Sequence, residues 1–200
     1  MRVTGGSAKG HKLLSPKSGC RFIRPTGDRV REALFNMLAE EIPDSLVLDL
    51  YAGTGALGIE ALSRGAEAVV FIDRSKQALE LIHRNVRACF PAAKASLVQL
   101  DLSRSDSMDQ LQKKIPLQFD LILLDPPYEK KLADSTLQMV ERGTVLKTDG
   151  LVAAEERKSE QLAAQYGTLT LIRSRKYGET GIWLYRNLIP AETDQIEAEQ

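Results

Sequence analysis

A strand, a glycine-rich turn and a helix follow one another between residues 46 and 64, and this unit restricts the fold more than any other part of the chain. Residues 46–51 form an apolar run, which is typical of a strand buried on both faces. Residues 52–58 contain three glycines in the spacing Gly-x-Gly-x-x-Gly, which lets the backbone turn tightly and approach a ligand closely. Since parallel strands are joined by crossover helices, the unit predicts an α/β protein with a mostly parallel sheet.

Acidic residues close the next strands along the chain, at the edge where ligands of open α/β sheets bind. Asp73 ends a second apolar run 20 residues after Gly53, and an acid at this spacing commonly accepts hydrogen bonds from a ribose hydroxyl pair. Asp101 ends a third run, where an adenine amino group could be bound. These acids indicate a cofactor that contains a nucleoside, although Asp73 could instead cap the helix that follows at Ser75, and Asp101 could be an ordinary loop acid.

Asp49 bears on which cofactor is bound, because it lies inside the first strand, four residues before Gly53. A carboxylate there would repel a pyrophosphate and attract the cationic amino-acid moiety of S-adenosylmethionine. This favours the methyl donor over a dinucleotide. Alternatively, Asp49 could brace the glycine turn by accepting hydrogen bonds from backbone N–H groups.

A second motif follows the apolar run 121–124, which is typical of an interior parallel strand and ends in Asp125-Pro126-Pro127-Tyr128. Prolines lack an N–H donor and fix φ, so they stop the strand ladder and leave nearby carbonyls free to accept hydrogen bonds. A carboxylate, free carbonyls and a flat ring suit a planar molecule that bears an NH2 group. The alternative is that these residues form only a sharp exit from the strand.

The rest of the chain predicts helices and strands that complete such a sheet. Two late apolar runs are joined by only seven residues, too few for a crossover helix, so they predict an antiparallel hairpin. The N-terminal residues predict a small β-hairpin arm, because short apolar pairs alternate there with turn signals. The predicted helices are 29–40, 76–89, 106–114 and 132–146, and the further strands are 68–73, 96–101, 151–155, 168–173 and 181–186.

Charge and composition limit the classes of function. The chain has 27 basic and 27 acidic residues, but residues 1–31 hold eight Lys or Arg against one acid, which favours contact with phosphates. The two cysteines and two histidines are isolated in sequence, so neither a disulfide framework nor a metal site is expected. No window approaches the roughly 18 apolar residues of a membrane span, and we expect a cytoplasmic protein.

The combination of Asp49-x-x-x-Gly53-x-Gly55, Asp73, Asp125-Pro-Pro-Tyr and a terminal hairpin resembles the S-adenosylmethionine-dependent amino-methyltransferases with a Rossmann-like, seven-stranded sheet. More narrowly, the chain resembles the bacterial small-subunit (16S) rRNA guanine-N2 methyltransferases of the RsmD type. This narrower resemblance covers roughly residues 1–187 and rests on Arg-Val-Thr-Gly-Gly at 2–6, Arg-Pro-Thr at 24–26, Asp-Arg-Val-Arg-Glu at 28–32 and Lys-x-x-x-Thr at 176–180. The acidic tail after Pro190 has no role in it.

The resemblance implies a fold, a domain division and a set of site residues. The fold is a mostly parallel seven-stranded sheet with an antiparallel C-terminal hairpin and a small N-terminal β-hairpin arm. The division is a basic arm at 1–24, a methyltransferase domain at 25–187 and a flexible acidic tail at 188–200. The catalytic residues are Asp125, Pro126, Pro127 and Tyr128. The residues that bind S-adenosylmethionine are Asp49, Tyr51, Ala52, Gly53, Thr54, Gly55, Asp73, Arg74, Asp101, Leu102 and Asp125. The residues that bind RNA are Lys9, Lys12, Arg24, Thr26, Arg29, Arg31, Lys176 and Tyr177.

The implied reaction is methyl transfer to the exocyclic N2 of a guanine in 16S rRNA, by a monomer acting on a 30S subunit or an assembly particle. Asp125 and the Pro126 carbonyl would accept hydrogen bonds from the amino group, and Tyr128 would stack on an unpaired or flipped base. Three alternatives remain. They are an amino-methyltransferase for DNA adenine, DNA cytosine or a protein amide, a non-catalytic RNA-binding assembly factor, and a nicotinamide oxidoreductase.

Overall fold

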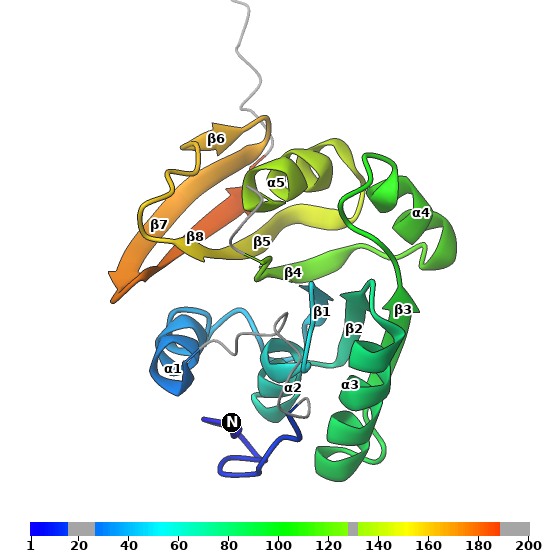
Figure 1. The fold of residues 1–200 in the computed structure, drawn as a ribbon. Coiled ribbons are helices and arrows are strands. Elements are labelled where there is room, and N and C mark those ends of the chain that lie inside the picture. The colour runs from blue at the N-terminus through cyan, green and yellow to red at the C-terminus, as the bar shows by residue number, and fades with distance from the viewer. Residues whose placement is uncertain (16–26, 128–131, 189–200) are drawn as a thin grey trace, which may run out of the picture.

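The computed structural model describes residues 1–15, 27–127 and 132–188, and shows three layers with a central sheet between two layers of helices (Figure 1). The sheet has eight strands in the order β3-β2-β1-β4-β5-β8-β7-β6. The strands are β1 (Leu46–Leu50), β2 (Ala68–Asp73), β3 (Lys94–Gln99), β4 (Phe119–Leu124), β5 (Leu146–Arg157), β6 (Gln165–Tyr166), β7 (Leu169–Tyr177) and β8 (Thr180–Asn187). The helices are α1 (Asp28–Met37), α2 (Ala56–Ser63), α3 (Lys76–Cys89), α4 (Ser107–Lys114) and α5 (Leu132–Arg142).

The first five strands run parallel and the last three are antiparallel to their neighbours. The chain winds outward from β1 through β2 to β3, and then returns to the other side of β1 to form β4 and β5. The order of the strands therefore reverses between β1 and β4, which creates the crevice where open α/β sheets bind ligands.

Each face of the sheet buries its own apolar core. One core packs α1, α2, α3 and the N-terminal residues against the sheet, with Phe35 of α1, Ile59 of α2 and Ile82 of α3 fully buried. The other core packs α4 and α5 against the opposite face, through Leu111 and Leu137. Figure 1 shows the two helical layers on opposite sides of the sheet. We call these the α1–α3 face and the α4–α5 face.

The predicted α/β class, the parallel sheet and the C-terminal hairpin are confirmed, and the bounds of several elements differ from the prediction. The helices α1 and α5 end at Met37 and Arg142 instead of residues 40 and 146, and β7 extends to Tyr177 instead of residue 173. β3 ends at Gln99 instead of residue 101, so Asp101 lies in the loop that follows. β5 begins at Leu146, five residues before its predicted start. The sheet has an eighth strand because Gly167, at a φ of 51°, folds the two-residue β6 back onto β7.

The N-terminal arm is a small hairpin within residues 1–15, as predicted. Arg2 and Lys12 form an antiparallel bridge, and the N–H of Val3 donates to the carbonyl of His11 at 3.0 Å. Val3 and Leu13 are buried in the same core as α1, α2 and α3. The described part of the arm therefore packs as part of the α1–α3 face. Among the described residues, no helix combines the length and the apolar character that crossing a membrane requires.

Candidate active site

The glycine loop between β1 and α2 adopts the tight turn that the sequence predicts. Gly53 and Gly55 have φ values of 55° and 78°, the left-handed region that glycine enters without strain. Gly55 directly precedes the first residue of α2. A Cβ added there would lie 3.1 Å from the side chain of Ile82, so α3 packs closely under the turn.

Two acids hold this loop in place through backbone N–H groups. Asp49 accepts a hydrogen bond from the N–H of Gly58 at 2.9 Å. Asp73 accepts from the N–H of Gly53 at 2.9 Å and from the N–H of Ser75 at 2.8 Å. The bracing role that the sequence left open for Asp49 is therefore present. Asp73 does not cap α3, because the N-cap is Ser75, whose hydroxyl accepts from the N–H of Ala78 at 3.3 Å. Since a carboxylate has several acceptor positions, neither bond precludes contact with a ligand.

Acidic side chains gather at this edge of the sheet. The pKa of Asp49 is raised to about 8, mainly by burial and also by the nearby charges of Asp125 and Asp73, which together outweigh the lowering effect of the Gly58 hydrogen bond. Burial likewise raises the pKa of Glu156 at the end of β5, with Glu160 and Asp125 adding to the shift. The site therefore has unneutralised negative potential, which favours a cationic ligand.

The residues after β4 lie beside the glycine loop. β1 and β4 are parallel neighbours in a register that pairs Leu50 with Leu124, so the chain leaves both strands at the same edge. Asp125 is half-buried and Pro126 is buried, whereas Pro127 is exposed. This places the Asp-Pro-Pro motif and the glycine loop on either side of the crevice, close enough for one site to include both. Tyr128 lies outside the described residues.

Tyr51 connects the glycine loop to the opposite helical layer. It has a φ of 59°, which is uncommon for a residue with a side chain. Its hydroxyl is 2.9 Å from Oγ1 of Thr136 in α5. The side chain of Tyr51, which the sequence predicts to bind the donor, is therefore held by α5. Sequence reasoning missed Thr136 as its partner.

The other residues predicted to bind the cofactor lie along the ends of β2 and β3. Arg74 and Asp101 both line an open hollow of about 750 Å³ next to the acid Asp73. Hydrogen bonds from the N–H and the hydroxyl of Ser103 lower the pKa of Asp101. The side chain of Leu102 is buried in the core of the α4–α5 face, so only its backbone groups remain for a ligand. Ala52 and Thr54 are buried within the glycine loop.

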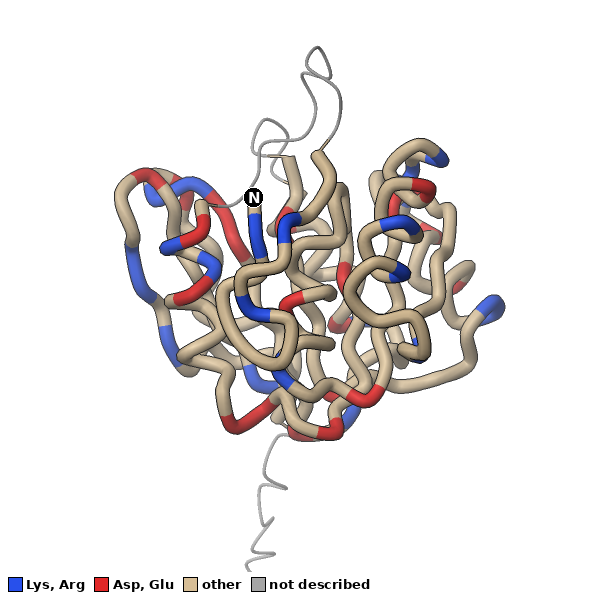
Figure 2. Tube along the Cα trace, turned by 90° about the horizontal axis from the view of Figure 1, so that it is seen from below, with Lys and Arg blue, Asp and Glu red and all other residues tan. Residues whose placement is uncertain are grey.

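The residues predicted to bind RNA divide into exposed and buried groups. Lys9, Lys12, Arg29 and Lys176 are exposed and Tyr177 is half-buried, whereas Arg24 and Thr26 lie outside the described residues. Figure 2 shows basic positions on the N-terminal arm and at the end of the molecule formed by α1, β7 and β8.

The prediction that Arg31 contacts phosphate is wrong, because its side chain is fully buried. Its Nη2 donates to Asp28 at 3.0 Å and to the carbonyl of Arg2, and its Nε is 3.5 Å from Oε2 of Glu60. A basic residue in the first turn of a helix opposes the helix dipole, so a nearby anion is expected to accompany Arg31. The anions are Asp28 and Glu60 of the protein itself.

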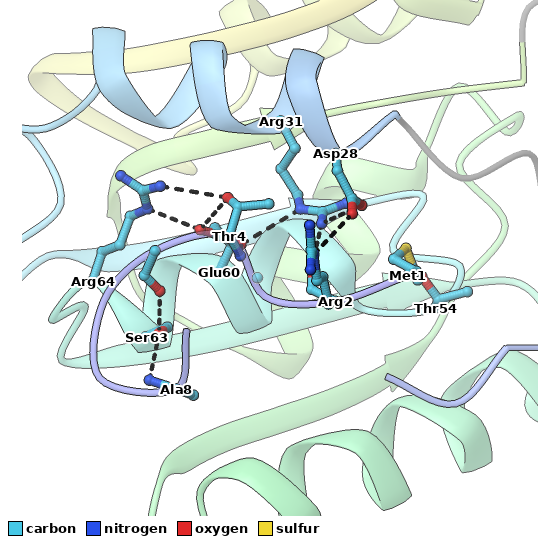
Figure 3. Close-up of polar contacts among 12 residues, drawn as sticks. Met1, Arg2, Thr4, Ala8, Asp28, Arg31, Thr54, Glu60, Ser63 and Arg64 are labelled. Carbon is cyan, nitrogen blue, oxygen red and sulfur yellow. Dashed lines mark hydrogen bonds and ion pairs between the residues drawn. The ribbon is translucent and has the colours of Figure 1, made fainter. Parts of the chain in front are cut away.

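Glu60 joins three segments of the chain (Figure 3). Its carboxylate accepts hydrogen bonds from the N–H and the hydroxyl of Thr4, both at 2.7 Å, and from Nε of Arg64 at 3.0 Å. Together with the ion pair to Arg31, these bonds tie the N-terminal arm and α1 to α2. We call Arg31, Glu60, Arg64 and Thr4 the Glu60 cluster. Sequence reasoning missed this role of Glu60, although Glu60 is the only charged residue in the apolar helix Ala56–Ser63.

Asn85 of α3 ties the same arm to the glycine loop. Its side-chain amide donates to the carbonyl of Thr54 at 3.0 Å and to the carbonyl of Leu14 at 3.1 Å, and it accepts from the N–H of Leu14 at 2.8 Å. Asn85 is 1% exposed. A polar residue on the buried face of an amphipathic helix was the signal that sequence reasoning passed over.

The glycine loop follows β1, the Asp-Pro-Pro motif follows β4, and acids lie near the ends of β1, β2 and β4, where the order of the strands reverses. This arrangement is that of a Rossmann-like methyltransferase fold. The family model described as "Conserved hypothetical protein 95" matches residues 1–186. The chain therefore belongs to this family, that of the ribosomal RNA small subunit methyltransferase D proteins, and the resemblance found in the sequence is confirmed.

Individual relatives agree along nearly the whole chain. The ribosomal RNA small subunit methyltransferase D of Haemophilus influenzae is 34% identical over 188 residues, which cover 94% of this chain and 94% of the relative. The protein of the same name from Escherichia coli K12 is 34% identical over 195 residues, covering 97% and 93%. The solved structure "Putative methyltransferase yhhF from Escherichia coli" superposes with a TM-score of 0.78 at 32% identity, covering 94% of this chain and 98% of that one.

Proposed function

We propose that the protein transfers a methyl group from S-adenosylmethionine to the exocyclic N2 of a guanine in small-subunit ribosomal RNA. The observation that carries this proposal is the register of β1 and β4, which brings the glycine loop and Asp125-Pro126-Pro127 to the same crevice. Membership in the methyltransferase D family supports the reaction class and the RNA substrate.

The residues around the glycine loop fit a donor that carries positive charge. S-adenosylmethionine supplies an electrophilic methyl group on a sulfonium and carries a cationic amino-acid moiety. Asp49, Asp73 and Asp125 lie close enough that their charges raise the pKa of Asp49, so a cation would relieve their repulsion. Asp73, Arg74 and Asp101 would hold the nucleoside part along the ends of β2 and β3.

We expect binding of the donor to release a proton from Asp49. The folded protein keeps this carboxyl protonated up to about pH 8, whereas a bound cation favours the ionised form. Affinity for the donor should therefore rise with pH between about 6 and 7.5, below the range of about 7.7–8.0 in which the donor's own α-amino group titrates. Calorimetry at pH 6.5 in two buffers of different ionisation enthalpy should show the release of about one proton.

The control is Asp49→Asn, whose amide oxygen can still accept the hydrogen bond from Gly58 but cannot ionise. It should bind the donor more weakly and without proton release. The same substitution should also remove the decrease in the free energy of unfolding that Asp49 causes as the pH rises from about 4 to about 8. The sign follows because a raised carboxyl pKa means that the folded state binds more protons than the unfolded state in that range. Equal proton release by both proteins would contradict the role of Asp49.

At the acceptor side, the protein contributes position and electrostatics. The lone pair of a guanine amino group is delocalised into the ring, which makes the nitrogen a poor nucleophile. Asp125 and the Pro126 carbonyl would accept hydrogen bonds from its two N–H groups and direct the lone pair into the crevice. Preorganised groups of this kind lower activation barriers by several kcal/mol. The nitrogen becomes cationic as it is methylated and then loses a proton readily, so a strong general base is not required.

The RNA would approach over the face that carries the N-terminal arm. Lys9, Lys12, Arg29 and Lys176 are exposed there or at the end of the sheet, and neutralised phosphates make such binding fall with salt. The target guanine must leave its stack for the amino group to enter the crevice. We infer that the substrate lies in a 30S subunit or an assembly particle, that the enzyme acts as a monomer, and that this substrate places it in the cytoplasm.

The test incubates the protein and labelled S-adenosylmethionine with unmodified rRNA, both free and in small subunits, and maps the modified nucleotide. The expected product is a single N2-methylguanine in the small-subunit rRNA. Methylation of adenine, cytosine or a protein amide instead would support another amino-methyltransferase. RNA binding without transfer to any form of the substrate would support a non-catalytic assembly factor.

A further inference from the structure

The outer edge of β7 is open over most of its length. Within the described residues, β6 pairs with β7 only through Gln165 with Thr170 and Tyr166 with Leu169. The N–H of Leu171 donates to the carbonyl of Ala164 at 2.9 Å, and from Arg173 to Tyr177 β7 pairs with β8 alone. An open strand edge can pair with another chain, and proteins commonly prevent this with charged side chains on the edge.

A β-bulge in β7 decides which way those side chains face. Leu171 pairs with Tyr185, but the next paired residue, Arg173, is opposite Leu184, which leaves Ile172 as an extra residue. Because side chains alternate along a strand, one extra residue moves every following side chain to the other face. The bulge therefore turns Arg173 away from the α4–α5 face, to which Tyr185 belongs.

Arg173 and Arg175 thereby join the α1–α3 face. Their partners on β8, Leu184 and Ile182, are buried in the core of that face. Tyr177, the next residue with the same orientation, packs against the same core. The edge thus presents two guanidinium groups on the face that also carries α1 and the N-terminal arm. Figure 2 shows both basic and acidic positions at this end of the molecule.

The charges on this edge are available to a ligand. Arg173, Arg175 and Lys176 are exposed. None of them forms an ion pair with a residue that the structure describes, and the guanidinium of Arg175 donates only to the carbonyl of its neighbour Ser174, at 3.1 Å. Two residues along a strand span about 6.7 Å, which is close to the separation of successive phosphates on one nucleic acid strand. A guanidinium binds phosphate through two parallel hydrogen bonds.

We propose that Arg173 and Arg175 form a phosphate-binding ladder for one RNA strand, which extends the RNA surface of the arm to the edge of the sheet. This inference rests on the proposed function, because it assigns a second contact with the same RNA. Charged residues on an edge strand also prevent unwanted strand pairing. Glutamates would serve that purpose equally well, so the two roles can be separated by reversing the charge.

The test measures the binding of unmodified small-subunit rRNA by Arg173→Glu/Arg175→Glu over a range of salt concentrations. We expect at least a tenfold loss of affinity at low salt and unchanged affinity for S-adenosylmethionine. In Arg173→Ala/Arg175→Ala, the slope of log K against log salt should fall by about 1.4, which corresponds to two contacts with a single strand. Both side chains are exposed, so the fold should be retained, and circular dichroism checks this.

The matched control is Lys113→Glu/Arg142→Glu, which reverses two exposed charges on the opposite, α4–α5 face. It should keep nearly the wild-type affinity. Wild-type affinity and slope in both Arg173/Arg175 variants would overturn the proposal and leave edge protection as the role of these residues. Failure of the wild-type protein to methylate any RNA would refute the proposed function instead, and would leave this binding result intact.

Discussion

Replacing Asp125 with alanine should lower the rate of methyl transfer by about 10²–10³-fold, the cost typical of removing one preorganised hydrogen-bonding group from an active site. The carboxylate lies at the end of β4, beside the glycine loop, where it would accept an N–H of the target amino group. Asp125 is only half-buried, so the fold should survive its loss. Single-turnover transfer to small-subunit rRNA measures the effect on the reaction, and calorimetry measures donor binding, which should persist.

Asp125→Asn separates the two contributions of this side chain. The amide oxygen still accepts a hydrogen bond, although the charge is lost, so its rate should lie between those of the wild type and Asp125→Ala. Asp109→Ala, which removes an exposed acid from the first turn of α4, serves as the control and should leave the rate unchanged. Wild-type turnover in Asp125→Ala would remove this residue from the mechanism.

The largest effect on stability should come from Glu60→Ala. Glu60 is fully buried, as is its partner Arg31. Removing the carboxylate leaves the buried guanidinium without its one fully buried counter-ion among the described residues, and deprives the N–H of Thr4 of its acceptor. Breaking a buried ion pair in this way costs about 3–5 kcal/mol. Urea unfolding followed by circular dichroism should show a midpoint shifted to lower concentration.

Two further variants test the cause of that loss. Glu67→Ala removes an acid whose ion pair with Lys94 is exposed on both sides, and it should cost less than about 1 kcal/mol. Arg31→Met/Glu60→Leu removes both buried charges at once and should recover part of the lost stability, because neither charge then remains uncompensated. A double variant less stable than Glu60→Ala would show that the charge pair is not the dominant contribution of the Glu60 cluster.

The Glu60 cluster and Asn85 together bond the N-terminal arm to α2 and to the glycine loop. Glu60 ties the arm to α2, whose first turn follows the glycine loop, and Asn85 ties Leu14 to the carbonyl of Thr54 within that loop. The arm that is expected to meet the RNA is thus bonded to the loop that is expected to hold the donor.

Local patterns predicted the features that short stretches of chain decide. The apolar runs, the spaced glycines, the acids at strand ends and the double proline each act within about ten residues. They indicated the α/β class, the parallel sheet, the C-terminal hairpin and the positions of Asp49, Asp73 and Asp125. The tight turn at Gly53 and Gly55 was predictable because only glycine enters the left-handed region without strain.

Tertiary structure alone decided the partners of polar groups and the faces of strands. Arg31 looked like a phosphate ligand in the sequence, yet it is buried because Glu60, 29 residues further on, meets it across the packing of α1 on α2. The orientation of Arg173 and Arg175 depends on a one-residue bulge opposite β8. Composition and periodicity give the pattern within an element, but long-range register determines which surfaces meet, and burial then fixes whether a charge contacts solvent or another charge.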